Sequence, residues 1–166
     1  YLPEHPLTYG FMTGRELLVM AGRLFMMDRK RLADAAERLL SLVSLAAAAD
    51  RRISTYSRGM MQRIGLAQAL VNDPDLVILD EPTGGLDPIG RMDIRKIIGD
   101  LRAAGKTVFF SSHELSEVEL VCDRVAILAR GRLIAEGPAR SLAGPGESLE
   151  QYFLRVVTAC REGDKP

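Results

Sequence analysis

The spacing of apolar residues changes near the middle of the chain. In the first part, up to residue 72, apolar positions recur every three or four residues, a period that is typical of amphipathic helices. After Asp73-Pro74 short strand-like runs appear instead, "LVIL" at 76–79 and "TVFFSS" at 107–112. Such runs predict strands that are buried on both faces. The chain is therefore expected to begin with helices and to continue with alternating strands and helices.

Three helices are predicted in the first part. Thr13 is a suitable N-cap for "GRELLVMAGRLF", and Glu16 three residues later completes a capping box with it. A second helix covers roughly residues 29–43, where leucine, alanine and valine repeat at helical spacing. A third helix follows Ser57, which is a good N-cap for the apolar-rich "MMQRIGLAQALV".

A strand–helix–strand–helix–strand order is predicted for the second part. Asp87 suits the N-cap of a helix that starts at Pro88, and Gly105 suits its C-terminal stop. Another helix is expected at about residues 114–122, and "RVAILA" follows it as a third strand. This order implies a parallel sheet with helices on both faces, which is an α/β fold.

The C-terminal part is predicted to contain a hairpin and a short helix. The apolar segments "RVAILA" and "RLIAEG" flank Arg130-Gly131, a pair that suits a hairpin turn. Residues 148–157, "SLEQYFLRVV", predict an amphipathic helix whose capping box pairs Ser148 with Gln151.

Composition and charge exclude several classes of protein. Lysine plus arginine equals aspartate plus glutamate, at 22 each in 166 residues, so a broad nucleic-acid-binding surface is not expected. No apolar run approaches the length that crosses a bilayer, and the chain, which begins without Met, carries no secretory signal. Cys122 and Cys160 lack metal-ligand spacing and are interpreted as free thiols in a reducing compartment, with a disulfide as the alternative.

Three groups of residues carry side chains suited to phosphate chemistry. Asp80 and Glu81 end the first predicted strand, where ligands bind in parallel α/β sheets, and adjacent carboxylates there can hold Mg²⁺ and orient a water molecule. Ser57 and Gly59 lie at a helix N-terminus, whose unpaired N–H groups can hold an anion. His113 follows the second strand and can donate a hydrogen bond to a phosphate oxygen. Each group alone also has a plain structural explanation as solvated acids, an ordinary helix cap or a capping histidine.

Taken together, the order and spacing of these groups resemble the nucleotide-binding domain of an ABC transporter. "YSRGMMQR" is similar to the family signature, "LVILDEPTGGLDP" to its Walker B strand and D-loop, and "SSHELSEVE" to its switch-histidine loop. "YLPEHP" is similar to the Q-loop region, with Glu4 at the position usually held by Gln. The resemblance covers residues 1–157, and these forms of the motifs are most similar to the exporter branch, whose permeases are separate membrane subunits.

The resemblance implies three residues for the hydrolysis of ATP. Asp80 would act on Mg²⁺, and Glu81 would be the catalytic carboxylate. His113 would contact the γ-phosphate.

It also implies four residues for binding and coupling. Ser57 and Gly59 would hold the γ-phosphate of an ATP molecule that is bound to the opposing subunit. Asp87, in the D-loop, would bridge the dimer interface. Glu4 would sense the metal or water and couple the site to the permease, although a charge in place of Gln would retune that sensing.

The chain departs from the family pattern inside and outside the signature. Arg58 and Met60 stand where the family usually has Gly and Gln. The P-loop pattern GxxxxGK[ST], which supplies most of the phosphate grip, does not occur. Gly105-Lys106-Thr107 matches only its last three positions, because Asp100 stands where the first Gly is required and a helix precedes the triplet. Gly105 is therefore interpreted as a helix stop.

The resemblance implies a partial P-loop NTPase-type parallel sheet with an ABC α-helical subdomain. A partial ATPase domain would cover residues 1–157, truncated before the Q-loop. Within it, residues 12–72 would form the helical subdomain and signature helix, and residues 73–137 the core from Walker B to the switch histidine. Residues 138–166 would form a tail with a short helix.

The implied function is that of the ATP-binding and ATP-hydrolysing subunit of an ABC membrane exporter. Its cofactors would be ATP and Mg²⁺. Its partners would be a second ATPase subunit, in a homo- or heterodimer, and an integral-membrane permease, with no nucleic acid. It would lie in the cytoplasm, peripheral at the inner face of the cell membrane. Because the P-loop is missing, the chain alone is expected neither to bind ATP tightly nor to hydrolyse it.

Two alternatives remain open from the sequence. A soluble ABC ATPase that acts on ribosomes or DNA would share these motifs, but such proteins usually carry tandem ATPase domains, long coiled coils or inserted zinc sites. A non-catalytic interaction module would keep the dimer surface and lose the chemistry. Glu81 and His113 argue against that decay, because both catalytic positions remain filled.

Overall fold

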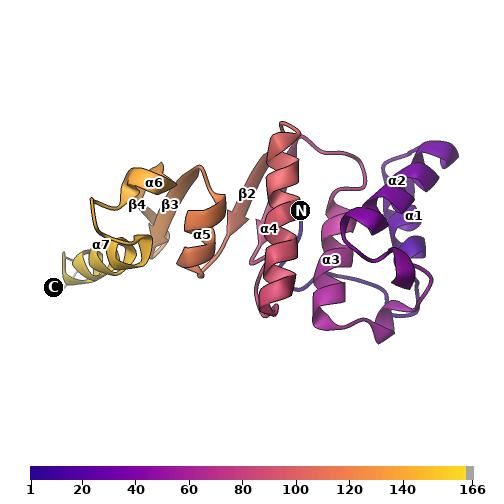
Figure 1. Ribbon diagram of the computed structural model, residues 1–166, viewed down its shortest axis with the longest axis horizontal. Helices are drawn as coiled ribbons and strands as arrows, with labels where there is room; N and C mark the ends of the chain where they lie inside the picture. The colour runs from indigo at the N-terminus through magenta and orange to yellow at the C-terminus, as the bar shows by residue number, and fades with distance from the viewer. Residues whose placement is uncertain (164–166) are drawn as a thin grey trace. The chain divides into compact units, whose positions relative to one another are not determined.

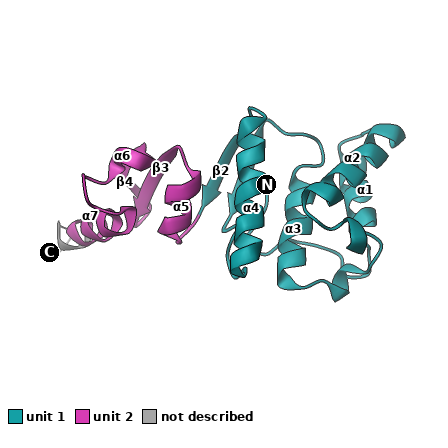
Figure 2. Cartoon of the chain, in the orientation of Figure 1, with its two compact units in different colours: residues 1–111 teal, residues 112–166 magenta. Residues whose placement is uncertain are grey.

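The computed structural model describes residues 1–163, shown in Figure 1. The chain divides into two compact units, residues 1–111 and 112–166, which are coloured separately in Figure 2. The first unit holds the helical part and a parallel pair of strands. The second holds an antiparallel hairpin and its helices. The boundary at 111/112 falls between β2 and α5, whereas the domain limits expected from the sequence, 72/73 and 137/138, remain predictions.

The helical part of the first unit contains three α-helices that pack on one another. They are α1 (Gly14–Leu24), α2 (Arg29–Leu42) and α3 (Arg58–Ala69), with short 3-10 turns η1 (Ala46–Ala48) and η2 (Ile53–Thr55) between α2 and α3. Their apolar faces bury a shared core of leucine, isoleucine and valine side chains. The most buried members are Leu17, Leu18, Leu39, Leu40, Val43, Ile53, Ile64 and Leu66.

The predicted helix starts are confirmed. The side chain of Thr13 accepts a hydrogen bond from the Glu16 N–H, and the Glu16 carboxylate accepts one from the Thr13 N–H, so both halves of the capping box are present. Ser57 caps α3 by accepting from the Met60 N–H. These caps satisfy N–H groups that the first helical turn leaves without a partner in the helix.

The parallel sheet of the first unit consists of β1 (Leu76–Asp80) and β2 (Thr107–Ser111), in register from Leu76 opposite Thr107 to Asp80 opposite Ser111. The prediction that both strands are buried on both faces is wrong. Val77 and Leu79 are buried, but Leu76 and Ile78 on the other face of β1 are 52% and 40% exposed. The reason is that α4 packs against β2 but does not cover the face of the sheet that carries Leu76 and Ile78.

The helix between these strands, α4 (Pro88–Ala103), begins and ends as predicted. Asp87 caps it by accepting from the Gly90 N–H at 2.8 Å. At its end Gly105 has φ +79, and the N–H groups of Gly105 and Lys106 donate to the carbonyls of Arg102 and Leu101. This is a Schellman motif. The Gly105-Lys106-Thr107 triplet therefore ends a helix and starts a strand, which is the reverse of a P-loop.

The second unit contains a hairpin with three helices. Its strands are β3 (Arg124–Ala129) and β4 (Arg132–Pro138), joined through Arg130 and Gly131, whose φ angles of 50 and 74 suit a type I′ turn. The hairpin prediction is confirmed. The expectation that "RVAILA" adds a third strand to the parallel sheet is wrong, because β3 pairs with β4 alone among the described strands. The tight turn at Arg130 and Gly131 favours pairing with this neighbour along the chain.

The helices of this unit are α5 (Leu115–Val121), α6 (Ala139–Leu142) and α7 (Leu149–Gly163). The predicted capping box of α7 is present, with reciprocal bonds between Ser148 and Gln151. The helix continues to Gly163, beyond the expected end at residue 157.

The cysteines and the lengths of the helices are the last features of the fold that bear on the sequence analysis. Cys122 and Cys160 are free thiols. Burial raises the pKa of Cys122 to about 11, with a smaller contribution from Asp123, so this thiol stays protonated at neutral pH. None of the helices within residues 1–163 combines the length and the apolar character that a bilayer-spanning helix needs.

Candidate functional site

The carboxyl end of β1 places two adjacent acids beside one serine of β2. The Ser111 hydroxyl donates a hydrogen bond of 2.6 Å to Oδ1 of Asp80. The Glu81 N–H donates to the carbonyl oxygen of Ser111 at 3.2 Å and lies 3.3 Å from its Oγ. Both acids are partly exposed. This hydrogen bond fixes the orientation of the Asp80 carboxylate. Its second oxygen is then suited to bind a hard cation such as Mg²⁺.

The backbone of Glu81 is strained. Its φ is 46, in the left-handed region that favours glycine. A residue other than glycine in this region costs on the order of 1–3 kcal/mol, and such strain gathers at functional sites. The strand thus ends at Asp80, directly before this residue.

The loop after Glu81 is a tight turn that leads into α4. The Gly84 N–H donates to the Glu81 carbonyl at 2.9 Å, and the Leu86 N–H donates to the Thr83 carbonyl at 3.2 Å. Thr83 is buried, with 5% of its surface exposed. Asp87 ends the loop, and its carboxylate is committed to the cap of α4. We call residues 83–87 the D-loop segment.

The D-loop segment lies against the N-terminus of α3. A Cβ added to Gly85 would lie 2.4 Å from Cζ of Arg58, so only the absence of a side chain lets the guanidinium pack there. A Cβ added to Gly59 would lie 3.7 Å from Leu86. The structure therefore brings Ser57 and Gly59 next to the loop that follows the two acids. The substitution of Arg for the usual Gly at position 58 is accommodated by Gly85.

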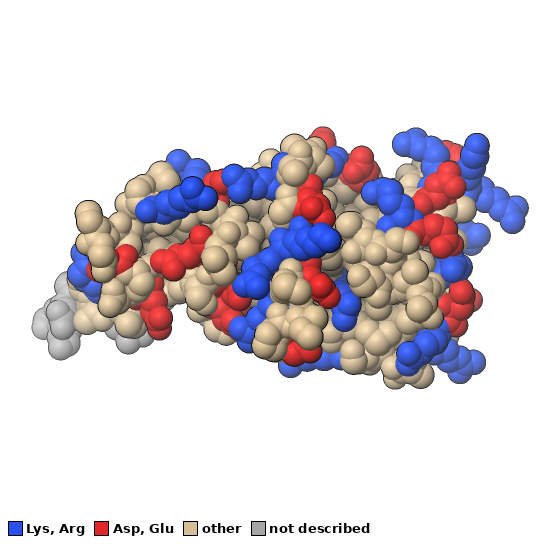
Figure 3. All heavy atoms as spheres, in the orientation of Figure 1, with Lys and Arg blue, Asp and Glu red and all other residues tan. Residues whose placement is uncertain are grey.

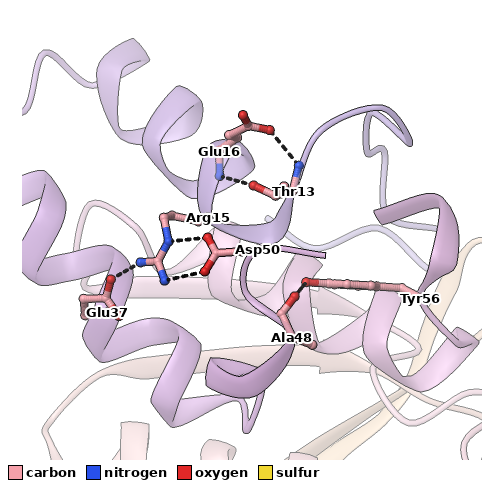
Figure 4. A network of polar contacts seen from close by, with 7 residues as sticks. All are labelled: Thr13, Arg15, Glu16, Glu37, Ala48, Asp50 and Tyr56. Atoms are coloured by element: carbon pink, nitrogen blue, oxygen red, sulfur yellow. Dashed lines mark hydrogen bonds and ion pairs between the residues drawn. The ribbon is translucent and has the colours of Figure 1, made fainter. Parts of the chain in front are cut away.

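The residue before Ser57, Tyr56, is bonded to η1, as Figure 4 shows, and lies beside the start of α1. The Tyr56 hydroxyl donates to the Ala48 carbonyl at 2.7 Å, and a Cβ added to Gly14 would lie 2.6 Å from that hydroxyl. Burial raises the pKa of Tyr56. The segment from Tyr56 to Gly59 thus contacts η1 and the start of α1 on one side and the D-loop segment on the other.

A charged network supports this region from α1 and α2 (Figure 4). Arg15 donates two hydrogen bonds to the Asp50 carboxylate, at 2.7 and 3.3 Å, and a third bond to Glu37 on α2. The hydrogen bond from Arg15 lowers the pKa of Asp50, and the same bond raises the pKa of Arg15. The network joins the loop before η2 to both helices.

The N-terminal residues run beside β1. The Leu2 N–H donates to the Ile78 carbonyl and the Asp80 N–H donates to the Leu2 carbonyl, both at 2.8 Å, which gives an isolated parallel bridge between Leu2 and Leu79. Glu4 follows two residues later and is exposed. This bridge brings the start of the chain to the strand that carries Asp80. The role expected for Glu4 stays a prediction.

His113 belongs to the second unit, two residues after Ser111, and is exposed. Its predicted contact with a phosphate therefore stays a prediction. Within residues 1–163 there is no group of three or more His, Cys, Asp or Glu residues that could hold a metal ion. Asp80 fits Mg²⁺ as a single protein ligand, which is usual when phosphate oxygens and water complete the shell.

Sequence reasoning missed two features of this site. Ser111 could have been found, because it ends β2 as Asp80 ends β1, and parallel strands bring their carboxyl ends to one edge. The contact between Arg58 and Gly85 could not, because it depends on how α3 packs beside a loop that is distant in sequence.

Comparison with known proteins gives one consistent result. Residues 1–84 match the family model described as ABC transporter. An uncharacterized ABC transporter ATP-binding protein of Nostoc sp. is 50% identical over 146 residues, which are 87% of this chain and 44% of that protein. The Nod factor export ATP-binding protein I of Neorhizobium galegae is 47% identical over 130 residues, 78% of this chain and 38% of that protein.

A solved structure is also similar to this chain. It is described as the structure of the ATP binding subunit of an ABC transporter, with a TM-score of 0.82 and 28% sequence identity, over 94% of this chain and 67% of that one. The expected fold class, a partial sheet with an α-helical subdomain, is confirmed by this likeness. This chain spans less than half the length of the two curated relatives.

Proposed function

The chain belongs to the ABC transporter family of ATP-binding proteins, and we propose that it forms part of an ATPase subunit that powers export through a separate membrane permease. The observation that carries this proposal is the pair of acids at the end of β1, which Ser111 binds through the Asp80 carboxylate and the Glu81 N–H, and which a loop packed on the helix of Ser57 follows.

Asp80 and Glu81 divide the chemistry at the strand end. Asp80 would hold Mg²⁺, and the ion, when bound, neutralises charge on the phosphate groups. Glu81 would accept a hydrogen bond from the attacking water and orient it, since a carboxylate beside the reacting phosphate can take up the water proton. Ser111 keeps the Asp80 carboxylate in place.

The remaining candidate residues would act across a dimer. Ser57 and Gly59, at the N-terminus of α3, would offer N–H groups to the γ-phosphate of ATP bound to a second subunit. Asp87 would approach that subunit from the D-loop segment. His113 would donate a hydrogen bond to the γ-phosphate, and Glu4 would link the site to the permease.

A P-loop would have to come from outside these 166 residues, because the pattern does not occur in them. The curated relatives are more than twice as long as the region they share with this chain, which leaves room for it. The exposed apolar face of β1, with Leu76 and Ile78, agrees with a further layer of the domain. The chain alone would then neither bind ATP tightly nor hydrolyse it.

The partners and the place of action follow from the same proposal. A second ATPase subunit and an integral-membrane permease would complete the transporter, and the chain would lie at the inner face of the cell membrane. The Nod factor export protein, by its name, belongs to an export system, which supports the direction of transport proposed here.

The experiment joins this chain to a P-loop. The segment that precedes the matching region in the Nostoc relative is fused to residue 1, and Mg-ATP hydrolysis is compared for the fusion and for the chain alone. The fusion should hydrolyse ATP, and the chain alone should not. A folded fusion that binds ATP but shows no hydrolysis above the relative's own isolated segment would contradict the proposal.

A further inference from the structure

The turn between α1 and α2 exposes three consecutive large apolar side chains. Leu24 is 78% exposed, Phe25 is 57% exposed and Met26 is 94% exposed. Single exposed apolar residues are common on soluble proteins, but a contiguous group at a protruding turn marks an interaction surface. We call residues 23–31 the tip segment.

The tip segment has a defined backbone. The N–H groups of Phe25 and Met27 both donate to the Gly22 carbonyl, at 3.1 and 3.2 Å, and the Met26 N–H donates to the Arg23 carbonyl at 2.9 Å. Met26 has φ 55, in the left-handed region that a β-branched or bulky residue avoids unless the turn requires it. Since these bonds fix the turn, its apolar side chains are held outward rather than folding back onto the protein.

Basic residues outnumber acids in the tip segment. It holds four basic residues and one acid, Asp28, whereas the whole chain is neutral. Arg31 lies 3.9 Å from Asp28, but Arg23, Arg29 and Lys30 form no ion pair in the part of the chain that the structure describes. Figure 3 shows Lys and Arg side chains, with Asp and Glu side chains among them, where α1 and α2 meet.

Two acids outside the tip segment lie close to it. Asp34 and Asp73 line the same hollow as Phe25 and Met26, together with Arg31 and Arg38. The four basic residues of the tip segment still exceed the acids there, Asp28 included.

These charges stand where they destabilise their own helix. Arg29, Lys30 and Arg31 are the first three residues of α2, whose first turn contains no acid. The N-terminus of a helix carries a partial positive charge, so cations there are unfavourable and acids are favourable. Arg31 pairs with the N-cap acid Asp28, but local stability gives no reason for Arg29 and Lys30 at this position, and an anionic partner outside the chain does.

We propose that the tip segment binds the surface of an anionic lipid bilayer. Leu24, Phe25 and Met26 would enter the boundary between headgroups and acyl chains, while the basic side chains stay among the headgroup phosphates. Each basic residue near an anionic leaflet strengthens binding about fivefold. The inference does not depend on ATP hydrolysis, so its outcome is separate from that of the ATPase proposal.

The other exposed apolar face of the first unit lacks this charge. Leu76, Ile78 and Phe109 are exposed on the β1–β2 sheet. The charged residues that come just before these two strands in the chain are Asp73, Asp75 and Lys106, and Lys106 pairs with both acids. This face therefore supplies a control with similar apolar character and without a cluster of basic residues.

The test uses tryptophan as a reporter, because the chain contains none. Phe25→Trp and Phe109→Trp place a single indole on the tip segment and on the sheet face. Vesicles of phosphatidylglycerol with phosphatidylcholine are titrated into each full-length variant, and vesicles of phosphatidylcholine alone serve as the neutral comparison. The emission of Phe25→Trp should shift to the blue with the anionic vesicles only, and the emission of Phe109→Trp should not shift.

A charge variant separates a binding role from a structural role. Arg29→Glu/Lys30→Glu in the Phe25→Trp background should weaken vesicle binding by more than about tenfold. The same change should raise the melting temperature, because it puts acids in the first turn of α2. Loss of binding in a folded, more stable variant supports the proposal. Equal shifts at positions 25 and 109, binding to neutral vesicles, unchanged binding by the charge variant, or no vesicle binding at all, as for a surface that docks protein instead, each overturn it.

Discussion

Ser111 binds both acids at the end of β1 through its hydroxyl and its backbone carbonyl. Ser111 donates to the Asp80 carboxylate and accepts the Glu81 N–H through its carbonyl oxygen, so both acids depend on the residue opposite them in the sheet. The serine hydroxyl holds one oxygen of the Asp80 carboxylate. The site is therefore made by two strands and not by the acidic pair alone.

Replacement of Ser111 tests this dependence. Ser111→Ala should lower the free energy of unfolding by about 1–2 kcal/mol, between the net value of a typical hydrogen bond and that of a bond to a charged group. Ser111→Thr keeps the hydroxyl in a strand that favours β-branched residues, and it should leave stability nearly unchanged. Urea unfolding followed by circular dichroism measures both variants. Equal losses for Ala and Thr would mean that the hydroxyl is not the cause.

The Arg15–Asp50 pair makes stability depend on pH. The pKa of Asp50 is lowered in the folded chain, so its contribution is present above the ordinary aspartate value of 3.8 and is lost as the pH falls through the lower folded value. The wild type should therefore exceed Asp50→Asn in stability at pH 7, and the difference should shrink below pH 3.8. Urea unfolding at several pH values checks this. A difference that stays constant down to the lowest pH would rule out the ion pair as its source.

At the scale of elements, helix caps and tight turns were predictable from the sequence, because they involve residues that are close along the chain. The burial of strand faces was not, because it depends on residues that are distant along the chain. Helix caps at Thr13, Ser57 and Asp87 were predictable because a cap involves residues three or four apart. The apolar run of β1 correctly indicated a strand, but not that half of it would be exposed. The pairing of β3 was predicted both as a hairpin and as part of a parallel sheet, and the local turn at Arg130-Gly131 decided it.

Two glycines, Gly99 within α4 and Gly105 just after its end, should respond in opposite directions to the same substitution. Gly99 is exposed in the helix interior with nothing within 4 Å of an added Cβ, so Gly99→Ala should stabilise the chain by up to about 1 kcal/mol. Gly105 ends the helix with φ +79, so Gly105→Ala should destabilise it by about 1 kcal/mol. Thermal unfolding of both variants gives the comparison. Stabilisation by Gly105→Ala would contradict the Schellman motif.

At the scale of the whole molecule, the order of motifs along the chain was the decisive signal. The signature, the acidic strand end and the histidine each have ordinary structural explanations, and only their succession identified the family that the relatives confirm. The packing of Arg58 on Gly85 and the apolar, basic tip segment were not predictable from motifs, because both depend on side chains that tertiary structure brings together or exposes.

The central claim is that Glu81 is the carboxylate that activates water in an ATPase site completed by a P-loop. The most direct measurement is hydrolysis and binding of ATP by the fusion with the Nostoc segment, compared with its Glu81→Gln variant. We predict that Glu81→Gln lowers the hydrolysis rate by at least about a hundredfold, because a positioned acid or base contributes that much, while ATP still binds as in the parent. Undiminished hydrolysis by a folded Glu81→Gln fusion would contradict the account.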